Sequence, residues 1–106
     1  MKYWVYLIIA AIFEVGWPLG LKMADISVYK VGWIAFSVLT MTLSGIFLFL
    51  AQHGIIIGTA YAVWSGIGAS CTFLIGVLFF ADTLNWMRFL GIIMIVSGVV
   101  LLKLGD

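Results

Sequence analysis

Four long apolar runs, separated by short polar breaks, constrain this chain more than any other feature of its sequence. The runs cover roughly residues 3–21, 31–51, 55–80 and 86–103, and the breaks contain KMADISVYK, QHG and ADTLN. Each run is long enough to cross a bilayer as a helix, which takes about 20 apolar residues. None shows the alternation of apolar and polar residues that a membrane β-strand requires. The sequence therefore predicts an all-α integral membrane protein with four transmembrane helices.

The composition agrees with a lipid environment. Hydrophobic residues make up 66% of the 106 residues and charged residues 8%, whereas an ordinary soluble domain has about 25% charged residues. Four spans with short links occupy nearly the whole sequence, so we expect residues 1–106 to form a single four-helix transmembrane subunit. The start MKYWVYLIIAAIF resembles a signal peptide. Because Glu14 interrupts the run and no convincing cleavage site follows, we expect a retained first helix.

The distribution of basic residues predicts insertion in two orientations. With four spans, Lys2 and Lys103 fall on one side of the membrane, and Lys22, Lys30 and Arg88 fall on the other. Orientation follows the excess of Lys and Arg on one side, and a difference of one is almost no excess. Dual insertion permits an antiparallel dimer, and a weak bias toward one orientation is the alternative. The net charge of +1 gives no sign of nucleic-acid binding.

A single carboxylate, Glu14, lies in the middle of the first apolar run. An acid at this depth costs on the order of 3 kcal/mol on insertion scales and commonly marks a functional site. Trp17 and Pro18 share its helix face. Pro18 has no N–H, so the Glu14 carbonyl loses its helical partner and we expect irregular backbone there. We interpret Glu14 as a binding residue; the alternative is a protonated acid with a structural hydrogen bond.

The second run carries hydroxyl groups at spacings of three and four, at Ser37, Thr40 and Ser44. Such a stripe is typical of hydrogen bonds between membrane helices. A hydroxyl group that reaches the carboxylate is the functional alternative.

The third run, IIIGTAYAVWSGIGASCTFLIGVLFF, combines aromatic residues with glycines. Tyr61, Trp64 and Gly68 lie near one face, and the Gly66–Gly68 pair is a plausible bend. We interpret these residues as a site with a hinge, and the alternative is a packing ridge. The ridge residues recur every four positions: Gly58, Ala62, Gly66 and Ser70. In the fourth run, Gly91 and Gly98 are seven residues apart and suit helix packing.

The residue set favours cation binding over catalysis. Ser65 and Ser70 have no neighbouring base, and the sequence has no phosphate-binding loop and no metal-ligand spacing, so we expect no enzyme activity, cofactor or metal. A carboxyl group can hold either a proton or a cation, and that competition allows proton-coupled exchange. Aromatic rings add cation–π faces. Two antiparallel copies, each donating Glu14, would form one central site that faces alternate sides.

The segments FEVGW and LGLK, the long stretch GTAYAVWSGIGA, and the ending VLLKL resemble the small multidrug resistance family along essentially the whole chain. The resemblance implies an antiparallel dimer of four-helix subunits in the inner or plasma membrane of a prokaryote. It implies export of small organic cations in exchange for protons, with both at Glu14.

Trp17, three residues after the glutamate, resembles the guanidinium-exporting branch of that family. There the positions matching Trp17, Ser44, Tyr61 and Trp64 line or support the site, which makes Ser44 a predicted hydrogen-bond partner of Glu14. The departures from the branch pattern are Ala11, Pro18, Gly45 and Ile56. Pro18 and Gly45 are expected to widen the site for larger cations.

The sequence leaves several alternatives open. One is export of quaternary ammonium compounds and other drugs, and another is a heterodimer of two related chains instead of a homodimer. Outside transport, a membrane scaffold would use Glu14 only structurally, and an ion channel would use it for selectivity.

Overall fold

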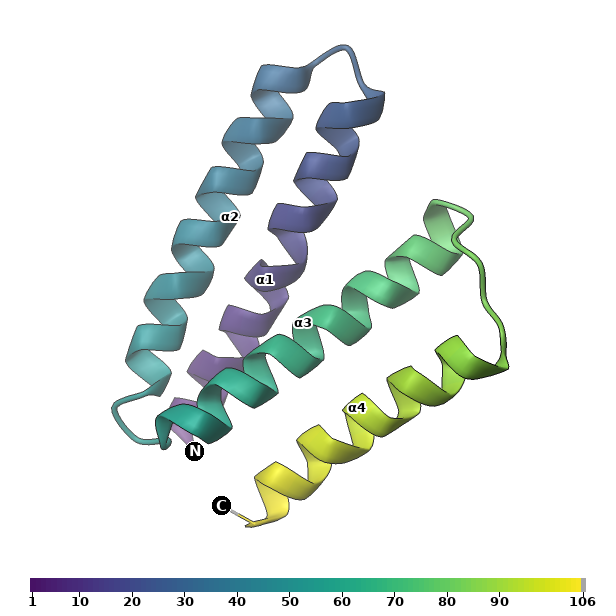
Figure 1. Ribbon diagram of the computed structural model, residues 1–106. Coiled ribbons are helices and arrows are strands. Elements are labelled where there is room, and N and C mark those ends of the chain that lie inside the picture. The colour runs from purple at the N-terminus through teal and green to yellow at the C-terminus, as the bar shows by residue number, and fades with distance from the viewer. Residues whose placement is uncertain (106) are drawn as a thin grey trace.

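The computed structural model describes residues 1–105, which form four α-helices joined by short loops (Figure 1). The helices are α1 (Lys2–Ile26), α2 (Lys30–Ala51), α3 (Ile57–Phe79) and α4 (Trp86–Gly105). All four are long and apolar enough to cross a membrane. No strand occurs within the described residues. The all-α prediction with four membrane helices is therefore confirmed.

The end of α1 was predicted wrongly. The sequence placed it near residue 21, but the helix continues to Ile26. Lys22 and the residues after it favour helix, so the first break comes at Ser27, where the backbone is extended with φ −110° and ψ 157°. The helix also runs through Pro18 without ending. Because Pro18 has no N–H, the Glu14 carbonyl has no helical donor at this point. The longer helix aligns Glu14, Pro18 and Lys22 at intervals of four residues on one face.

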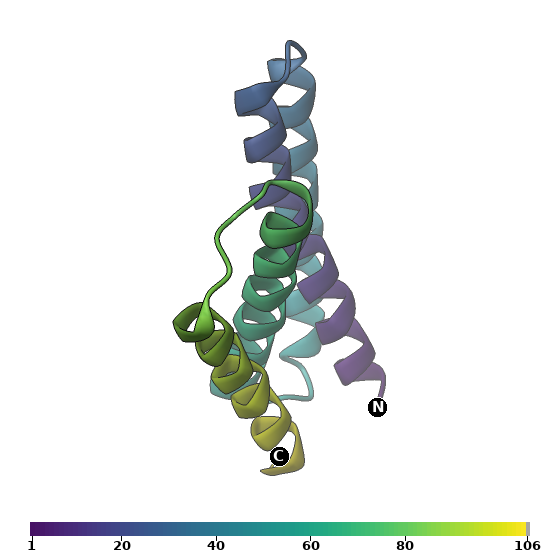
Figure 2. The same cartoon turned by 90° about the vertical axis from the view of Figure 1, so that its right-hand side faces the viewer.

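The four helices form one thin layer. α1 packs along α2 and against α3, while α4 packs against α3 (Figures 1 and 2). The chain measures 44 × 35 × 16 Å, and its smallest dimension only slightly exceeds the diameter of one helix with side chains, about 10–12 Å. α4 has no buried residue at all. The broad faces are therefore left for lipid or for another protein.

The N-terminus, the end of α4 and the loop between α2 and α3 lie at one end of the layer (Figure 1). A cluster of buried apolar residues fixes this end, with Trp64 of α3 packed against it. Its members are Leu7, Ala51, Ile55, Ala60 and Val63. The cluster ties α1, α2 and α3 together below the level of Glu14.

Small residues bring α1 and α2 into close contact. The Ser37 hydroxyl donates to the backbone carbonyl of Trp17 at 2.9 Å. Gly20 lies directly against Ser37, and a Cβ on Gly16 would be 2.8 Å from Thr40 Cγ2. Ser37 thus forms the predicted hydrogen bond between two helices. The Thr40 hydroxyl instead bonds to carbonyls of its own helix, and Thr40 contacts α1 only through packing at Gly16.

We expect Gly20→Ala to destabilise the fold. The new methyl group would collide with the Ser37 hydroxyl and lie 2.9 Å from Phe36 Cδ1. Overpacking of this kind costs about 1–3 kcal/mol, which thermal unfolding in detergent would detect by circular dichroism. Gly32→Ala is the matched control, because a Cβ there meets nothing within 4 Å. Equal stability of the two variants would contradict the proposed close contact.

Candidate functional site

Glu14 lies where α1 crosses α3, directly opposite Gly68. A Cβ on Gly68 would be 2.5 Å from Glu14 Cγ and 3.2 Å from Glu14 Cβ. Gly68 is buried, and Glu14 is partly buried. Only a residue without a side chain leaves room for the Glu14 stem at this crossing. The structure thus places a predicted hinge residue in contact with the predicted binding residue.

Trp17 adjoins Glu14 from one helical turn farther along α1. Its side chain lies near the Glu14 carboxyl group, and it is partly buried. Its backbone carbonyl is held by Ser37 of α2. Trp17 and Glu14 therefore lie one turn apart on α1, as their spacing predicts.

A chain of two hydrogen bonds joins three helices one turn below Glu14. Trp64 Nε1–H donates to Ser44 Oγ at 2.8 Å, and the Ser44 hydroxyl donates to the Ala10 carbonyl at 2.7 Å. Ser44 is fully buried. The predicted hydrogen bond from Ser44 to Glu14 is not formed, because a hydroxyl group has one proton and Ala10 accepts it. Sequence reasoning missed Ala10, since a backbone acceptor leaves no sequence signal.

Tyr61 occupies the outer edge of this group. Its side chain is 58% exposed, and its ring centroid lies 5.3 Å from that of Trp64 at an interplanar angle of 58°. Tyr61 thus extends the aromatic surface away from Glu14, one turn beyond Trp64. The structure brings Glu14, Trp17, Ser44 and Trp64 into adjacent turns and leaves Tyr61 at their margin.

The two glycines of the predicted hinge face different neighbours. Residues two apart on a helix point in nearly opposite directions, so Gly68 faces α1 while Gly66 faces α4. A Cβ on Gly66 would be 2.6 Å from Val99 Cγ2. α3 is continuous through both positions, so their observed role is close packing on two sides, at the level of Glu14.

Gly91 and Gly98 do not make the predicted packing contacts inside the described chain. A Cβ at either position meets nothing within 4 Å. α4 instead contacts α3 through Ile95 and Val99. The two glycines are partly buried beside these residues, and Gly98 lines a pocket with Thr59 of α3.

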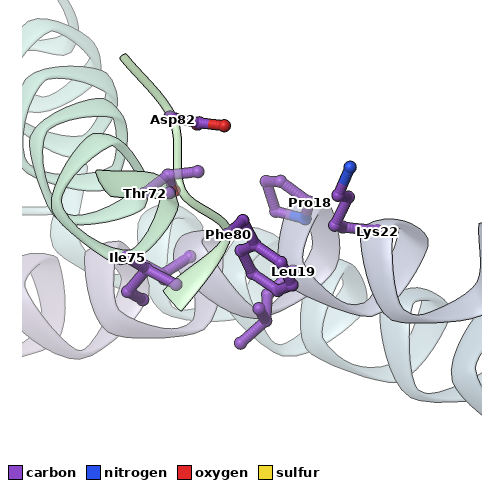
Figure 3. Close-up of a pocket in the computed structure, with 9 residues that line it drawn as sticks. Pro18, Leu19, Lys22, Thr72, Ile75, Phe80 and Asp82 are labelled. Carbon is purple, nitrogen blue, oxygen red and sulfur yellow. The ribbon is translucent and has the colours of Figure 1, made fainter. Parts of the chain in front are cut away.

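A pocket of about 200 Å³ begins one turn beyond Glu14, between α1 and α3 (Figure 3). Val15, Pro18 and Leu19 of α1 form one wall, and Thr72 and Ile75 of α3 form the other. Pro18 therefore borders a space, one turn from Glu14, that is lined by both apolar and charged residues.

Gly45 does not border that space. It is exposed, and a Cβ there meets nothing within 4 Å in the described chain. The prediction that Gly45 widens the site finds no counterpart within one subunit, because Ser44 takes the helix face toward α1. The sequence does carry a signal for the pocket, because residues four apart line up on one face of each helix. These residues are Glu14, Pro18 and Lys22 on α1 and Gly68, Thr72 and Gly76 on α3.

We expect Ser44→Ala to disturb the support of the site more than its overall fold. The change leaves the Trp64 indole N–H without its acceptor, a loss of about 0.6–2 kcal/mol for hydrogen bonds between membrane helices. The substrate concentration at half-maximal transport should rise, and thermal stability in detergent should fall modestly. Thr42→Ala is the control, since that hydroxyl bonds only to the Val38 carbonyl of its own helix. Unchanged transport in Ser44→Ala would assign the hydrogen-bond chain a purely structural role.

Comparison with known protein families agrees with this arrangement. A family model described as Small Multidrug Resistance protein matches residues 2–95. The match includes α1, α2, α3 and the first half of α4, with all the residues placed around Glu14. Members of that family are multi-pass membrane transporters of small cations and not enzymes. Because the match covers most of its length, the chain belongs to the small multidrug resistance family.

Proposed function

We propose that this chain exports guanidinium or substituted guanidinium ions in exchange for protons. Two antiparallel copies, inserted in opposite orientations in the inner or plasma membrane of a prokaryote, enclose one site with Glu14 from each subunit. Proton and cargo compete for the two carboxyl groups, and alternating access carries each in turn across the membrane. The observation that carries the proposal is the seating of Glu14 against Gly68 with the Trp17 indole beside it.

The chemistry of Glu14 and Trp17 suits a guanidinium group. A carboxylate accepts two parallel N–H bonds from the planar guanidinium ion, which a quaternary ammonium ion cannot donate. The flat cation also stacks on an indole face, at a gain of about 0.5–2 kcal/mol. Trp17 is one turn from Glu14 on the same helix face, so both interactions are available to one bound ion.

The pocket beside Pro18 favours cargo with an apolar substituent. A guanidinium head at Glu14 would place its substituent against Val15 and Pro18, in the space of about 200 Å³. Burial of each methylene group there is worth about 0.8 kcal/mol. The same apolar wall favours export of hydrophobic quaternary ammonium ions as the second candidate function.

The shape of the subunit supports assembly with a second copy. The layer is only 16 Å thick, Glu14 is partly exposed, and α4 has no buried residue. One subunit therefore leaves its carboxylate open on a broad face, and a partner is needed to enclose it. An identical chain is the simplest partner, because the nearly even distribution of Lys and Arg permits both orientations. A related chain forming a heterodimer is the alternative.

Currents from proteoliposomes on a solid support test the proposal. Guanidinium, phenylguanidinium and tetrapropylammonium are added in turn under a pH gradient, with protein-free liposomes as the blank. The proposal predicts currents with both guanidinium compounds, with half-saturation at a lower concentration for phenylguanidinium. Current with tetrapropylammonium alone would support the second candidate. The absence of current with all three compounds would contradict transport by the homodimer.

A further inference from the structure

The outer end of the pocket beside Pro18 holds two charged side chains that the proposed exchange at Glu14 does not use. Lys22 closes the α1 side, and Asp82, from the loop after α3, closes the other side. The Asp82 carboxylate points toward the wall formed by Pro18 and Lys22 (Figure 3). Lys22 is eight residues beyond Glu14, which corresponds to about 12 Å along the helix axis. This outer end is thus separate from the Glu14 carboxylate, and the pocket extends from it toward Glu14 as far as Val15 and Pro18.

Asp82 is held in place by the turn that ends α3. Its backbone N–H donates to the Gly76 carbonyl at 3.0 Å, and its carboxylate lies directly against Gly76, where a Cβ would collide with it. Ala81 has a φ of 56°, a left-handed conformation that reverses the chain at this point. The turn therefore folds the carboxylate back over α3 and toward the pocket.

The same outer end already holds an organic cation, the ammonium group of Lys22. Lys22 Nζ lies over the Phe80 ring, 5.8 Å from its centroid. Phe80 also lines the pocket. An aromatic face with a carboxylate on one wall is suited to an organic cation. The Lys22 stem is long and flexible, so its ammonium group can leave the ring and reach the membrane surface.

We infer that Asp82 and Phe80 form an outer capture site for the cargo cation, in which Lys22 is a tethered cation that the cargo displaces. The inference rests on the proposed cation export and adds a first stop about 12 Å before Glu14. An arriving cation replaces the Lys22 ammonium over Phe80, beside the Asp82 carboxylate, and then moves along Thr72 and Pro18 to the inner carboxylate. Lys22 returns to the ring once the cargo has passed.

Binding to chains that lack the inner carboxylate isolates this site. The full chain carrying Glu14→Gln is purified in detergent, and 4-fluorophenylguanidinium is followed by fluorine NMR, which detects millimolar binding. We expect 4-fluorophenylguanidinium to bind weakly to Glu14→Gln. The double variant with Lys22→Met should bind it about fivefold more tightly, because the competing ammonium group is gone. The triple variant that also carries Asp82→Asn should lose that gain. Asp25→Asn is the matched control, because Asp25 is an exposed acid at the same end of α1 and does not line the pocket.

Transport kinetics give a second, independent reading. In the otherwise unchanged chain, Asp82→Asn should raise the half-saturating concentration of phenylguanidinium about fivefold and leave the maximal rate unchanged. A lower maximal rate with unchanged half-saturation would assign Asp82 a structural role and overturn the inference.

Two results separate failure of the capture site from failure of the proposed function. In the first, the unchanged chain transports phenylguanidinium, but 4-fluorophenylguanidinium binds equally well to Glu14→Gln with and without Lys22→Met. In that case only the capture site is wrong. If the unchanged chain transports no guanidinium compound, the proposed function is wrong and the capture inference falls with it.

Discussion

Replacement of Glu14 by glutamine is expected to abolish proton-coupled transport. Glutamine keeps the size of the side chain, so its seat against Gly68 is preserved. It cannot ionise, however, so it neither attracts a cation nor carries a proton. Loss of a hydrogen bond to a charged group weakens binding by about 1.5–3 kcal/mol, or roughly 10- to 100-fold. The coupling to protons is lost altogether, so currents driven by a pH gradient should vanish.

The measurement is the phenylguanidinium current in proteoliposomes, with equal amounts of folded protein confirmed by circular dichroism. Glu14→Asp is the companion variant, because it retains a carboxyl group on a shorter stem and should retain proton-coupled exchange at a reduced rate. Full current in Glu14→Gln would support a scaffold in which the residue is structural. A cation current that persists without a proton gradient would instead indicate a channel.

Gly68→Ala is expected to have the second-largest effect. The added methyl group would lie 2.5 Å from Glu14 Cγ, so either the carboxylate or the α1–α3 crossing must move. Overpacking costs about 1–3 kcal/mol, and a misplacement of about 1 Å in a binding group can reduce its effect 100-fold. We expect the transport rate to fall by about 10- to 100-fold in a protein that still folds.

Gly58→Ala is the matched control for this variant. It makes the same change in the same helix, at a position where a Cβ meets nothing within 4 Å in the described chain. The alanine also favours helix by about 1 kcal/mol at both positions. If Gly68→Ala transports as well as Gly58→Ala does, the contact between Gly68 and Glu14 has no part in function.

The helices were predictable because lipid leaves few choices. Without water to satisfy free backbone groups, a continuous apolar run must form a helix, and all four runs do so. The end of α1 was not predictable in the same way. Residues 22–26 are polar enough to suggest a loop, yet they continue the helix past the apolar run to Ile26, because local helix propensity decides the boundary there and hydrophobicity does not.

The site was predictable only where it lies on one helix. Glu14 and Trp17 share a face of α1 by spacing alone. The contact with Gly68 and the bond from Ser44 to Ala10 depend on how α1, α2 and α3 are rotated against one another. That rotation is set by small residues such as Gly16 and Gly20 at the helix crossings, and no single segment encodes it.

The residues of α4 are largely exposed in a single subunit. Gly91 and Gly98 are predicted to pack, yet in the described chain a Cβ built on either glycine meets no atom of another element within 4 Å. α4 as a whole has no buried residue. In the proposed dimer, this exposed helix is available to pack against the second subunit.

If one carboxyl group holds either a proton or the cargo cation, binding of the cation must release a proton. Purified protein is prepared in weakly buffered detergent solution at the pH where Glu14 is half protonated. Phenylguanidinium is then added, and released protons are followed with a pH-sensitive dye. Competition at Glu14 predicts proton release that saturates together with binding and disappears in Glu14→Gln. Cation binding without proton release, or release that persists in Glu14→Gln, would contradict it.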